Sequence, residues 1–250
     1  MKTVFDIGMY DGADTEYYLS EGHKVVAVEA NPALVERAKA RFPIELSSGQ
    51  LVLVNAAVSM DSQQQVTLFI SGDDLGSSSA SMEQVASRNV IGSYSVSSVK
   101  VDELMKAHGV PYFMKVDIEG ADKFCILPLT SQMRPDYISF EAGEDVEELV
   151  LHLKAIGYQR FKAISQCNFM ELSNQEAFLF RLRRKIIHVL GYKDPEYVRC
   201  NGRFFRLMHS AGPAPWASDG TWCSAPALLD KWKEARNSAE FGGWFDIHAS

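Results

Sequence analysis

The sequence has few cysteines, and no two of them lie close together. Cys125, Cys167, Cys200 and Cys223 form no C-x-x-C pair, so a zinc ribbon has little support. Free thiols of this kind are typical of the reducing cytosol. No apolar run reaches the roughly 18 residues of a membrane-spanning helix, and the first residues lack the apolar stretch of a signal peptide. We therefore expect a cytoplasmic protein with no membrane span.

Positive charge is also scarce. The 250 residues include 25 lysines and arginines against 32 aspartates and glutamates, which gives a formal net charge of −7. A protein that coats nucleic acid needs the opposite balance, so we expect no nucleic-acid partner. We expect a single domain over residues 1–250. Its core would cover residues 1–165, and a C-terminal extension over 166–250 would complete the sheet.

The first half of the chain alternates short apolar runs with helical patterns. Runs such as Lys24 to Val28 are almost wholly apolar, which is typical of parallel strands buried on both faces. We expect strands at 3–7, 24–28, 51–54, 112–116, 137–140 and 158–163. We expect helices at 13–20, 32–42, 102–107, 144–156, 178–190 and 226–235, and one that begins at 121. Strand–helix–strand repeats at this spacing predict βαβ units in an α/β fold.

Several short signals mark turns and helix ends. Asn31 offers a helix N-cap with Pro32 at the first helical position, and Pro43 lies beyond the expected end of that helix. The dipeptide Asn201-Gly202 predicts a hairpin turn. Residues 71–98 are rich in glycine and serine, and we expect them to form a loop with at most one helical turn.

The loop after the first strand lacks the residues that bind phosphate. Gly8 and Gly12 do not complete G-x-G-x-x-G, and no lysine follows Gly12. A glycine at a strand end lets the backbone approach a ligand closely. The loop is acidic instead, with Asp6, Asp11 and Asp14, which disfavours a pyrophosphate and favours a cation. The ammonium and sulfonium of S-adenosylmethionine fit such a field.

Two further polar residues end the next strands. Glu29 follows Gly8 by 21 positions, and a carboxylate there can accept hydrogen bonds from both ribose hydroxyls. Asn55 ends the third strand, where its amide could reach an adenine edge or the ribose. Glu29 could instead be a solvated strand end, and Asn55 could be a turn-former. Their placement on consecutive strand ends favours the cofactor interpretation.

Four segments, DIGMYDGADT, VVAVEANP, VNAAVS and MKVDIEGAD, resemble the FkbM-type S-adenosylmethionine-dependent methyltransferases over roughly residues 3–165. The resemblance implies a class I methyltransferase fold, a Rossmann-like three-layer sandwich. Its seven-stranded sheet would be mostly parallel, with an antiparallel last strand. It also implies O-methylation of a hydroxyl on a sugar, a glycan or a natural-product small molecule. Residues 1–165 would then be the cofactor-binding core, and the extension over 166–250 would complete the acceptor site.

The resemblance also places residues at the cofactor. The family's Gly-Ala-Asn is replaced here by Gly8-Met9-Tyr10, and the larger Tyr10 would narrow the cavity. The residues that we expect to bind S-adenosylmethionine are Asp6, Gly8, Tyr10, Asp11, Gly12, Thr15, Glu29, Ala30, Asn31, Asn55, Ala56 and Asp117. We expect no bound metal, although carboxylates at Asp117 and Glu141 leave a metal-dependent mechanism open.

An alcohol acceptor needs a base, because a positioned group that takes its proton contributes about 10²- to 10⁴-fold in rate. Asp117, at the end of the fourth core strand, and Glu119 are the first candidates. Both could equally be structural, with Asp117 capping the following helix. His248 is a third candidate, with Asp246 at strand spacing as a partner that could orient it.

The segment from Arg181 to Arg206 holds eight basic and two acidic residues. It could contact an anionic acceptor, since arginine suits phosphate, or it could be a solvated surface. Two other functions remain open. An NAD(P)-dependent Rossmann oxidoreductase would need a third glycine and a less acidic loop. A non-catalytic S-adenosylmethionine-binding protein would need an acceptor side blocked by Met9 and Tyr10.

Overall fold

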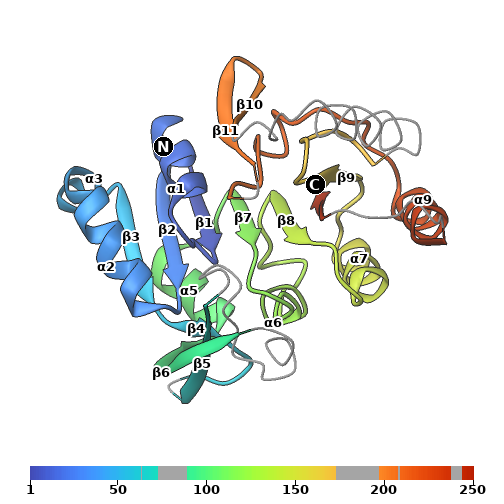
Figure 1. The fold of residues 1–250 in the computed structure, drawn as a ribbon. Helices are drawn as coiled ribbons and strands as arrows, with labels where there is room; N and C mark the ends of the chain where they lie inside the picture. Colours follow the sequence, from blue (N-terminus) through green and yellow to red (C-terminus); the bar gives the residue numbers. More distant parts are fainter. Residues whose placement is uncertain (63, 73–88, 173–196, 208, 238–243) are drawn as a thin grey trace. The chain divides into compact units, whose positions relative to one another are not determined.

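The computed structural model describes residues 1–62, 64–72, 89–172, 197–207, 209–237 and 244–250 (Figure 1). The chain divides into two compact units, Met1–Gly143 and Glu144–Ser250. The expected helix at 178–190 lies outside the described residues. So do the basic residues of the Arg181–Arg206 segment that precede Tyr197. Within the described part of the chain, no helix is both long and apolar enough to cross a membrane.

The first unit contains five parallel strands in the order β3-β2-β1-β7-β8. Their bounds are β1 Thr3–Ile7, β2 Lys24–Glu29, β3 Leu51–Asn55, β7 Phe113–Val116 and β8 Tyr137–Glu141. Ile7 is in register with both Val28 and Val116, so the carboxyl ends of β1, β2 and β7 lie side by side. In open α/β sheets, ligands bind at this edge.

Helices cover the sheet of the first unit. They are α1 Ala13–Ser20, α2 Pro32–Arg41, α3 Pro43–Ser48, α5 Val101–His108 and α6 Lys123–Ile126. Helix α1 packs against β1 and β2, and α2 packs against β2 and β3. Asn31 caps α2, since its Oδ1 accepts the Ala33 N–H at 3.0 Å. Pro43 lies beyond the end of α2, as expected, and it also occupies the first position of α3.

A small second sheet in the first unit was not predicted from the sequence. Strands β4 Ala57–Val58, β5 Gln65–Ser71 and β6 Val90–Val99 form it in the order β4-β6-β5. The expected loop over 71–98 is therefore wrong for its last part, where a ten-residue strand pairs antiparallel with β5.

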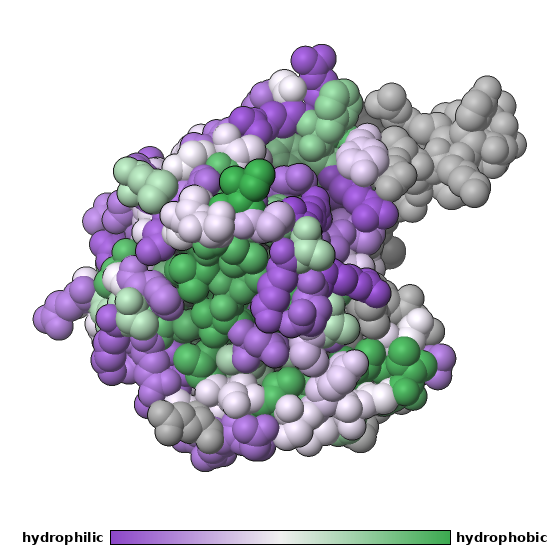
Figure 2. Space-filling view, turned by 90° about the vertical axis from the view of Figure 1, so that its left-hand side faces the viewer, coloured by the Kyte–Doolittle hydropathy of each residue, from purple (hydrophilic) through white to green (hydrophobic). Residues whose placement is uncertain are grey.

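Seen from the side of α2 and α3, apolar residues gather near the middle of the face, with hydrophilic residues around them (Figure 2).

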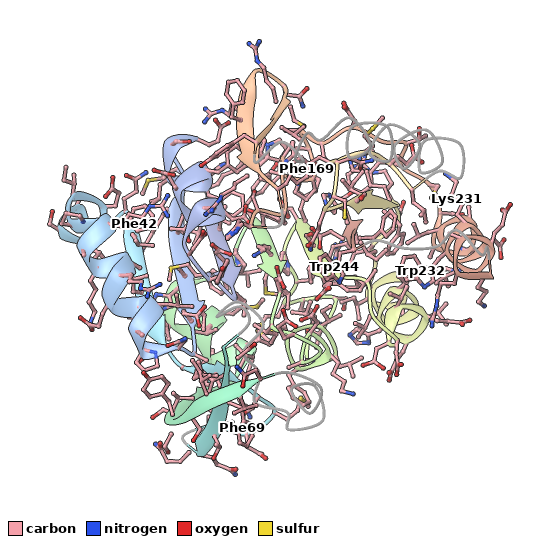
Figure 3. All side chains as sticks on the ribbon, viewed as in Figure 1. Phe42, Phe69, Phe169, Lys231, Trp232 and Trp244 are labelled. Carbon is pink, nitrogen blue, oxygen red and sulfur yellow. The ribbon has the colours of Figure 1, made fainter. Side chains whose placement is uncertain are left out.

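The second unit contains α7 Val146–Ala155, β9 Phe161–Ser165, β10 Tyr197–Cys200, β11 Arg203–Arg206, α9 Ala225–Asn237 and β12 Phe245–Ala249. Strand β12, the last of the chain, runs antiparallel to β9. Trp232, labelled in Figure 3, lies on α9. Its ring packs edge to face against that of Phe245, with 6.1 Å between the ring centroids. Strands β10 and β11 form the hairpin predicted from Asn201-Gly202.

The strands confirm the predicted fold class. Five of the seven main strands are parallel, and the last strand of the chain is antiparallel to its neighbour β9. Helices pack on the sheet in both units. This is the α/β class with a mostly parallel sheet and an antiparallel last strand.

Candidate active site at the carboxyl ends of the strands

Gly8 brings two strand ends into close contact. Its φ is 84°, and its N–H donates to Val28 O at 2.9 Å. A Cβ at this position would lie 1.8 Å from the carbonyl oxygen of Asp117, so only glycine fits. The expected reason for glycine was a close approach to a ligand. In the structure, the approach that requires it is between two backbone segments of the protein.

Asp6 and Thr15 form a buried pair beneath this loop. Asp6 is fully buried on β1, and Thr15 Oγ1 donates to its Oδ2 at 2.6 Å. Burial raises the pKa of Asp6 to about 6, while the nearby Lys115 ammonium acts in the opposite direction. Both residues were predicted at the cofactor, and their mutual hydrogen bond fixes α1 to the end of β1.

Lys115 is a central residue of the site that sequence reasoning missed. Its ammonium is buried on β7, 3.3 Å from Asp14 Oδ2, 3.4 Å from Asp117 Oδ2 and 3.7 Å from Asp6 Oδ1. The expected acidic field is therefore partly neutralised from within the sheet. A lysine inside a short, otherwise buried strand was the available signal, because a buried ammonium needs a charged partner.

Glu29 holds the turn after β1 through both of its carboxylate oxygens. Oε2 accepts the N–H of Tyr10 at 2.9 Å, and Oε1 accepts the N–H of Asn31 at 2.7 Å. Tyr10 has a positive φ of 53°, which this hydrogen bond helps to stabilise. Burial raises the pKa of Glu29 to about 7, with the two backbone N–H groups lowering it. Met9, the neighbour of Tyr10, is buried in the core.

Asn55 ties the end of β3 to the end of β2. Its Nδ2 donates to Glu29 O at 2.9 Å and to Ala30 O at 3.1 Å. Ala30 packs in turn against a small apolar cluster that includes Ala57 and Leu68. Asn55 thus fixes the backbone that carries Glu29. The adjacent Ala56, also predicted at the cofactor, is buried.

Asp11 and Gly12 form the start of α1. Asp11 Oδ1 accepts the N–H of Ala13 at 3.0 Å, and Gly12 is the N-cap residue with a left-handed φ of 83°. Arg41 of α2 donates to Asp11 O at 2.7 Å and pairs with Glu16 at 2.7 Å. The loop therefore has a basic neighbour that the sequence did not reveal.

The segment after β7 is held by a buried carboxylate that sequence reasoning also missed. Asp122 accepts the N–H of Ile118 and that of Glu141, each at 3.1 Å. Burial raises the pKa of Asp122 to about 7, and the Asp117 charge raises it further. Helix α6 begins only after Asp122, so Asp117 does not cap it. The Asp117 side chain is 32% exposed, and Glu119 has a φ of 51°.

His248 lies on β12, in the second unit, and is buried. Neither ring nitrogen makes a hydrogen bond within the described residues. Burial lowers its pKa to about 3, and the Lys162 charge lowers it further, so the imidazole is neutral at neutral pH. Asp246 Oδ1 instead accepts Gln166 Nε2 at 2.8 Å. The expected orienting bond between Asp246 and His248 is therefore not formed.

The part of the chain that the structure describes holds no group of three or more His, Cys, Asp or Glu side chains arranged to bind a metal ion. The four cysteines, all of which lie in described segments, are free. The strand edge thus offers carboxylates, one ammonium and backbone groups. Such a set can bind a ligand that is cationic and rich in hydroxyl groups.

Several solved structures share low similarity with the chain. An FkbM methyltransferase from Methylobacillus flagellatus KT is 13% identical over 64% of this chain, with a TM-score of 0.41, and the chain covers 39% of its length. A TehB-like S-adenosylmethionine-dependent methyltransferase from Corynebacterium glutamicum is 11% identical over 65% of this chain and 68% of its own, with a TM-score of 0.36. A methyltransferase from Thiobacillus denitrificans, in complex with S-adenosyl-L-homocysteine, is 9% identical over 100% of this chain and 84% of its own, with a TM-score of 0.36.

The family model gives the stronger result. No curated protein matches the chain, but the model of the methyltransferase FkbM domain matches residues 6–160. The match begins at the buried Asp6 of β1 and includes Glu29, Lys115 and Asp117, and so it covers the whole strand edge described above. The chain belongs to the FkbM methyltransferase domain family.

Proposed function

We propose that the protein is an S-adenosylmethionine-dependent O-methyltransferase that acts on a hydroxyl of a sugar, a glycan or a natural-product small molecule. The family is one of S-adenosylmethionine-dependent methyltransferases. The observation that carries the proposal is the group of carboxylates at the carboxyl ends of β1, β2 and β7. The proposal also places the enzyme in the cytoplasm, where its four free cysteines would stay reduced.

The residues at this edge fit the cofactor. Each Glu29 oxygen accepts one backbone N–H and can accept another hydrogen bond, so the ribose hydroxyls have acceptors. Asp117 presents a partly exposed carboxylate next to the glycine turn. Asp6 Oδ1 accepts no hydrogen bond within the described residues. Together these groups suit hydroxyl donors and a positive charge.

The chemistry divides between cofactor and protein. When bound, S-adenosylmethionine supplies a methyl group activated by a sulfonium. The protein aligns the acceptor, excludes water and takes the hydroxyl proton. Asp117 or Glu119 is the proposed base, since both follow β7 at the strand edge. His248 is the weaker candidate, because burial lowers its pKa to about 3.

The acceptor is proposed to carry a negative charge. On the β10–β11 hairpin, Arg199 and Arg203 are exposed, together with Tyr197 and the 70% exposed Phe204. The Arg199 guanidinium lies 6.0 Å from the centre of the Phe204 ring. Aromatic rings stack on sugars and guanidinium groups bind phosphate in bidentate fashion. These features support a phosphorylated or nucleotide-linked glycan as acceptor.

Two measurements test the proposal. Thermal shift with S-adenosylmethionine and with NAD distinguishes the methyltransferase from a Rossmann oxidoreductase, and stabilisation by NAD alone contradicts the proposal. Mass spectrometry of a glycan and natural-product panel then detects methyl transfer. Asp117→Asn and Glu119→Gln should each be assayed. The variant that removes the base should have a kcat about 10²- to 10⁴-fold below that of the wild type. Binding without transfer to any acceptor would support a non-catalytic binding protein instead.

A further inference from the structure

The side chain of Lys115 is almost completely enclosed, with 6% of it exposed. Its Nζ lies 3.3 Å from Gly8 O, in addition to the three carboxylates at 3.3–3.7 Å. These partners come from β1, from the turn after it, from α1 and from Asp117, which directly follows β7. One ammonium therefore links β1, the turn after it, the start of α1 and the residue that follows β7.

The acids around Lys115 outnumber it. Asp6, Asp14 and Asp117 face the ammonium directly. Glu29 at the end of β2 and Asp122 after β7 also interact with its charge; Asp122 is buried and Glu29 is half-buried. With all five acids ionised, the group carries a net negative charge, and Asp6, Asp14 and Asp122 carry theirs where water has little access. Because the carboxylates repel one another, the group holds protons that a bound cation would displace.

The titration of two of these acids supports this picture. Burial raises the pKa of Glu29 to about 7 and that of Asp6 to about 6. For both, the Lys115 charge acts to lower the pKa, and for Asp6 the charges of Asp14 and Asp117 raise it. Without a ligand at neutral pH, the group therefore retains part of a proton. A bound cation, or a hydroxyl that donates to Glu29, would favour the ionised forms.

We propose that Lys115 is a positioning residue that keeps the carboxylates at this edge ionised and in place, and that binding of S-adenosylmethionine there releases a proton from them. The inference rests on the proposed function, because it requires that this cofactor bind at the strand edge. Binding that releases a proton becomes tighter as pH rises, by at most about tenfold per pH unit for each proton. The affinity should therefore increase from pH 5.5 to pH 7.5 and level off above it.

The test is isothermal titration calorimetry between pH 5.5 and pH 9, in buffers of different ionisation enthalpy, which gives the number of protons released. S-adenosylhomocysteine, whose sulfur is uncharged, is the matched ligand and should release fewer protons. Wild-type binding that is independent of pH, with no proton released, overturns the inference. Absence of S-adenosylmethionine binding at every pH overturns the proposed function as well, so the two failures are distinct.

Variants then test the role of Lys115. In Lys115→Met the acids lose their counter-charge, so affinity at pH 7 should fall about tenfold or more and recover towards pH 9. The double variant Lys115→Met with Asp14→Asn restores the net charge and should recover much of the affinity at pH 7. It also covers the case in which the single variant does not fold. An equal loss of affinity at every pH in both variants contradicts the proposed role. The exposed Lys39→Met is the control.

Discussion

At the scale of single residues, Gly8 meets two separate demands. Its backbone has a left-handed φ, and a Cβ would lie 1.8 Å from Asp117 O. In Gly8→Ala, the conformational strain costs about 1–2 kcal/mol, and the forced shift of backbone adds roughly 1–3 kcal/mol. Chemical denaturation should show a loss in the free energy of unfolding well above the strain alone.

Gly22→Ala is the matched control for this prediction. Gly22 has a φ of 80°, close to that of Gly8, but nothing lies within 4 Å of its Cβ position. Its loss of stability should therefore reflect strain only. If both variants lose the same free energy of unfolding, the contact between Gly8 and the Asp117 peptide has no energetic role.

Glu29 supports a prediction about binding. In Glu29→Gln, one oxygen that accepts a backbone N–H is replaced by an amide donor, and the charge is lost. Hydrogen bonds to charged groups contribute about 1.5–3 kcal/mol each, so S-adenosylmethionine affinity should fall by about 10- to 100-fold. Calorimetry measures this. Glu36→Gln, on the exposed surface of α2, should bind as the wild type does, and unchanged affinity in Glu29→Gln would remove Glu29 from the site.

At the scale of elements, the β10–β11 hairpin is open to test through its charge. In the double variant Arg199→Glu and Arg203→Glu, an anionic acceptor should be repelled, so its KM should rise by about tenfold or more while the affinity for S-adenosylmethionine stays the same. The comparison variant changes Arg37 and Lys39 to glutamate, which alters the net charge equally on the exposed face of α2. A KM that rises equally in both variants indicates a general charge effect.

The parallel strands could be predicted because each one carries its own signal. Strands β1, β2 and β7 are short apolar runs between helix patterns, and they formed within a residue or two of the expected bounds. Strand β6 carries no such signal, because most of its side chains are exposed and it is rich in serine. Its pairing with β4 and β5, both distant from it in sequence, makes it a strand.

The site was predictable in part for the same reason. Glu29 and Asp117 stand at strand ends, a position that the sequence reveals, and the structure has them there. The roles of Lys115 and Asp122 depend on partners from other elements: Asp6 and Asp14 for the lysine, and the N–H of Glu141 for Asp122. A local pattern contains no information about such contacts.

At the scale of the whole molecule, the two units should respond to pH in opposite directions. In the first unit, burial raises the pKa of Asp122 and Glu29 to about 7 and that of Asp6 to about 6. The folded unit then holds protons that the unfolded chain releases, so its stability falls as pH rises from about 4 to 7. In the second unit, burial lowers the pKa of His248 to about 3. Below about pH 6.5, His248 takes up a proton in the unfolded chain but stays neutral in the folded unit. The stability of the second unit therefore falls as pH decreases below 6.5.

Hydrogen exchange read by mass spectrometry follows each unit separately. All four tryptophans lie in the second unit, so denaturant unfolding followed by tryptophan fluorescence reports on that unit. His248→Leu should remove most of its acid sensitivity, whereas His152→Leu on α7 should not. The same pH trend in both units, or an unchanged acid sensitivity in His248→Leu, would count against this assignment.

The contact between Gly8 and Asp117 also limits how the protein can be redesigned. The loop that follows β1 and the loop that follows β7 meet where the Gly8 backbone lies against the carbonyl group of Asp117. A library that diversifies residues 9–11 for a new cofactor analogue will therefore disturb the geometry of residues 117–120, and the reverse is also true. Directed evolution of cofactor specificity should therefore vary residues 9–11 and 117–120 together.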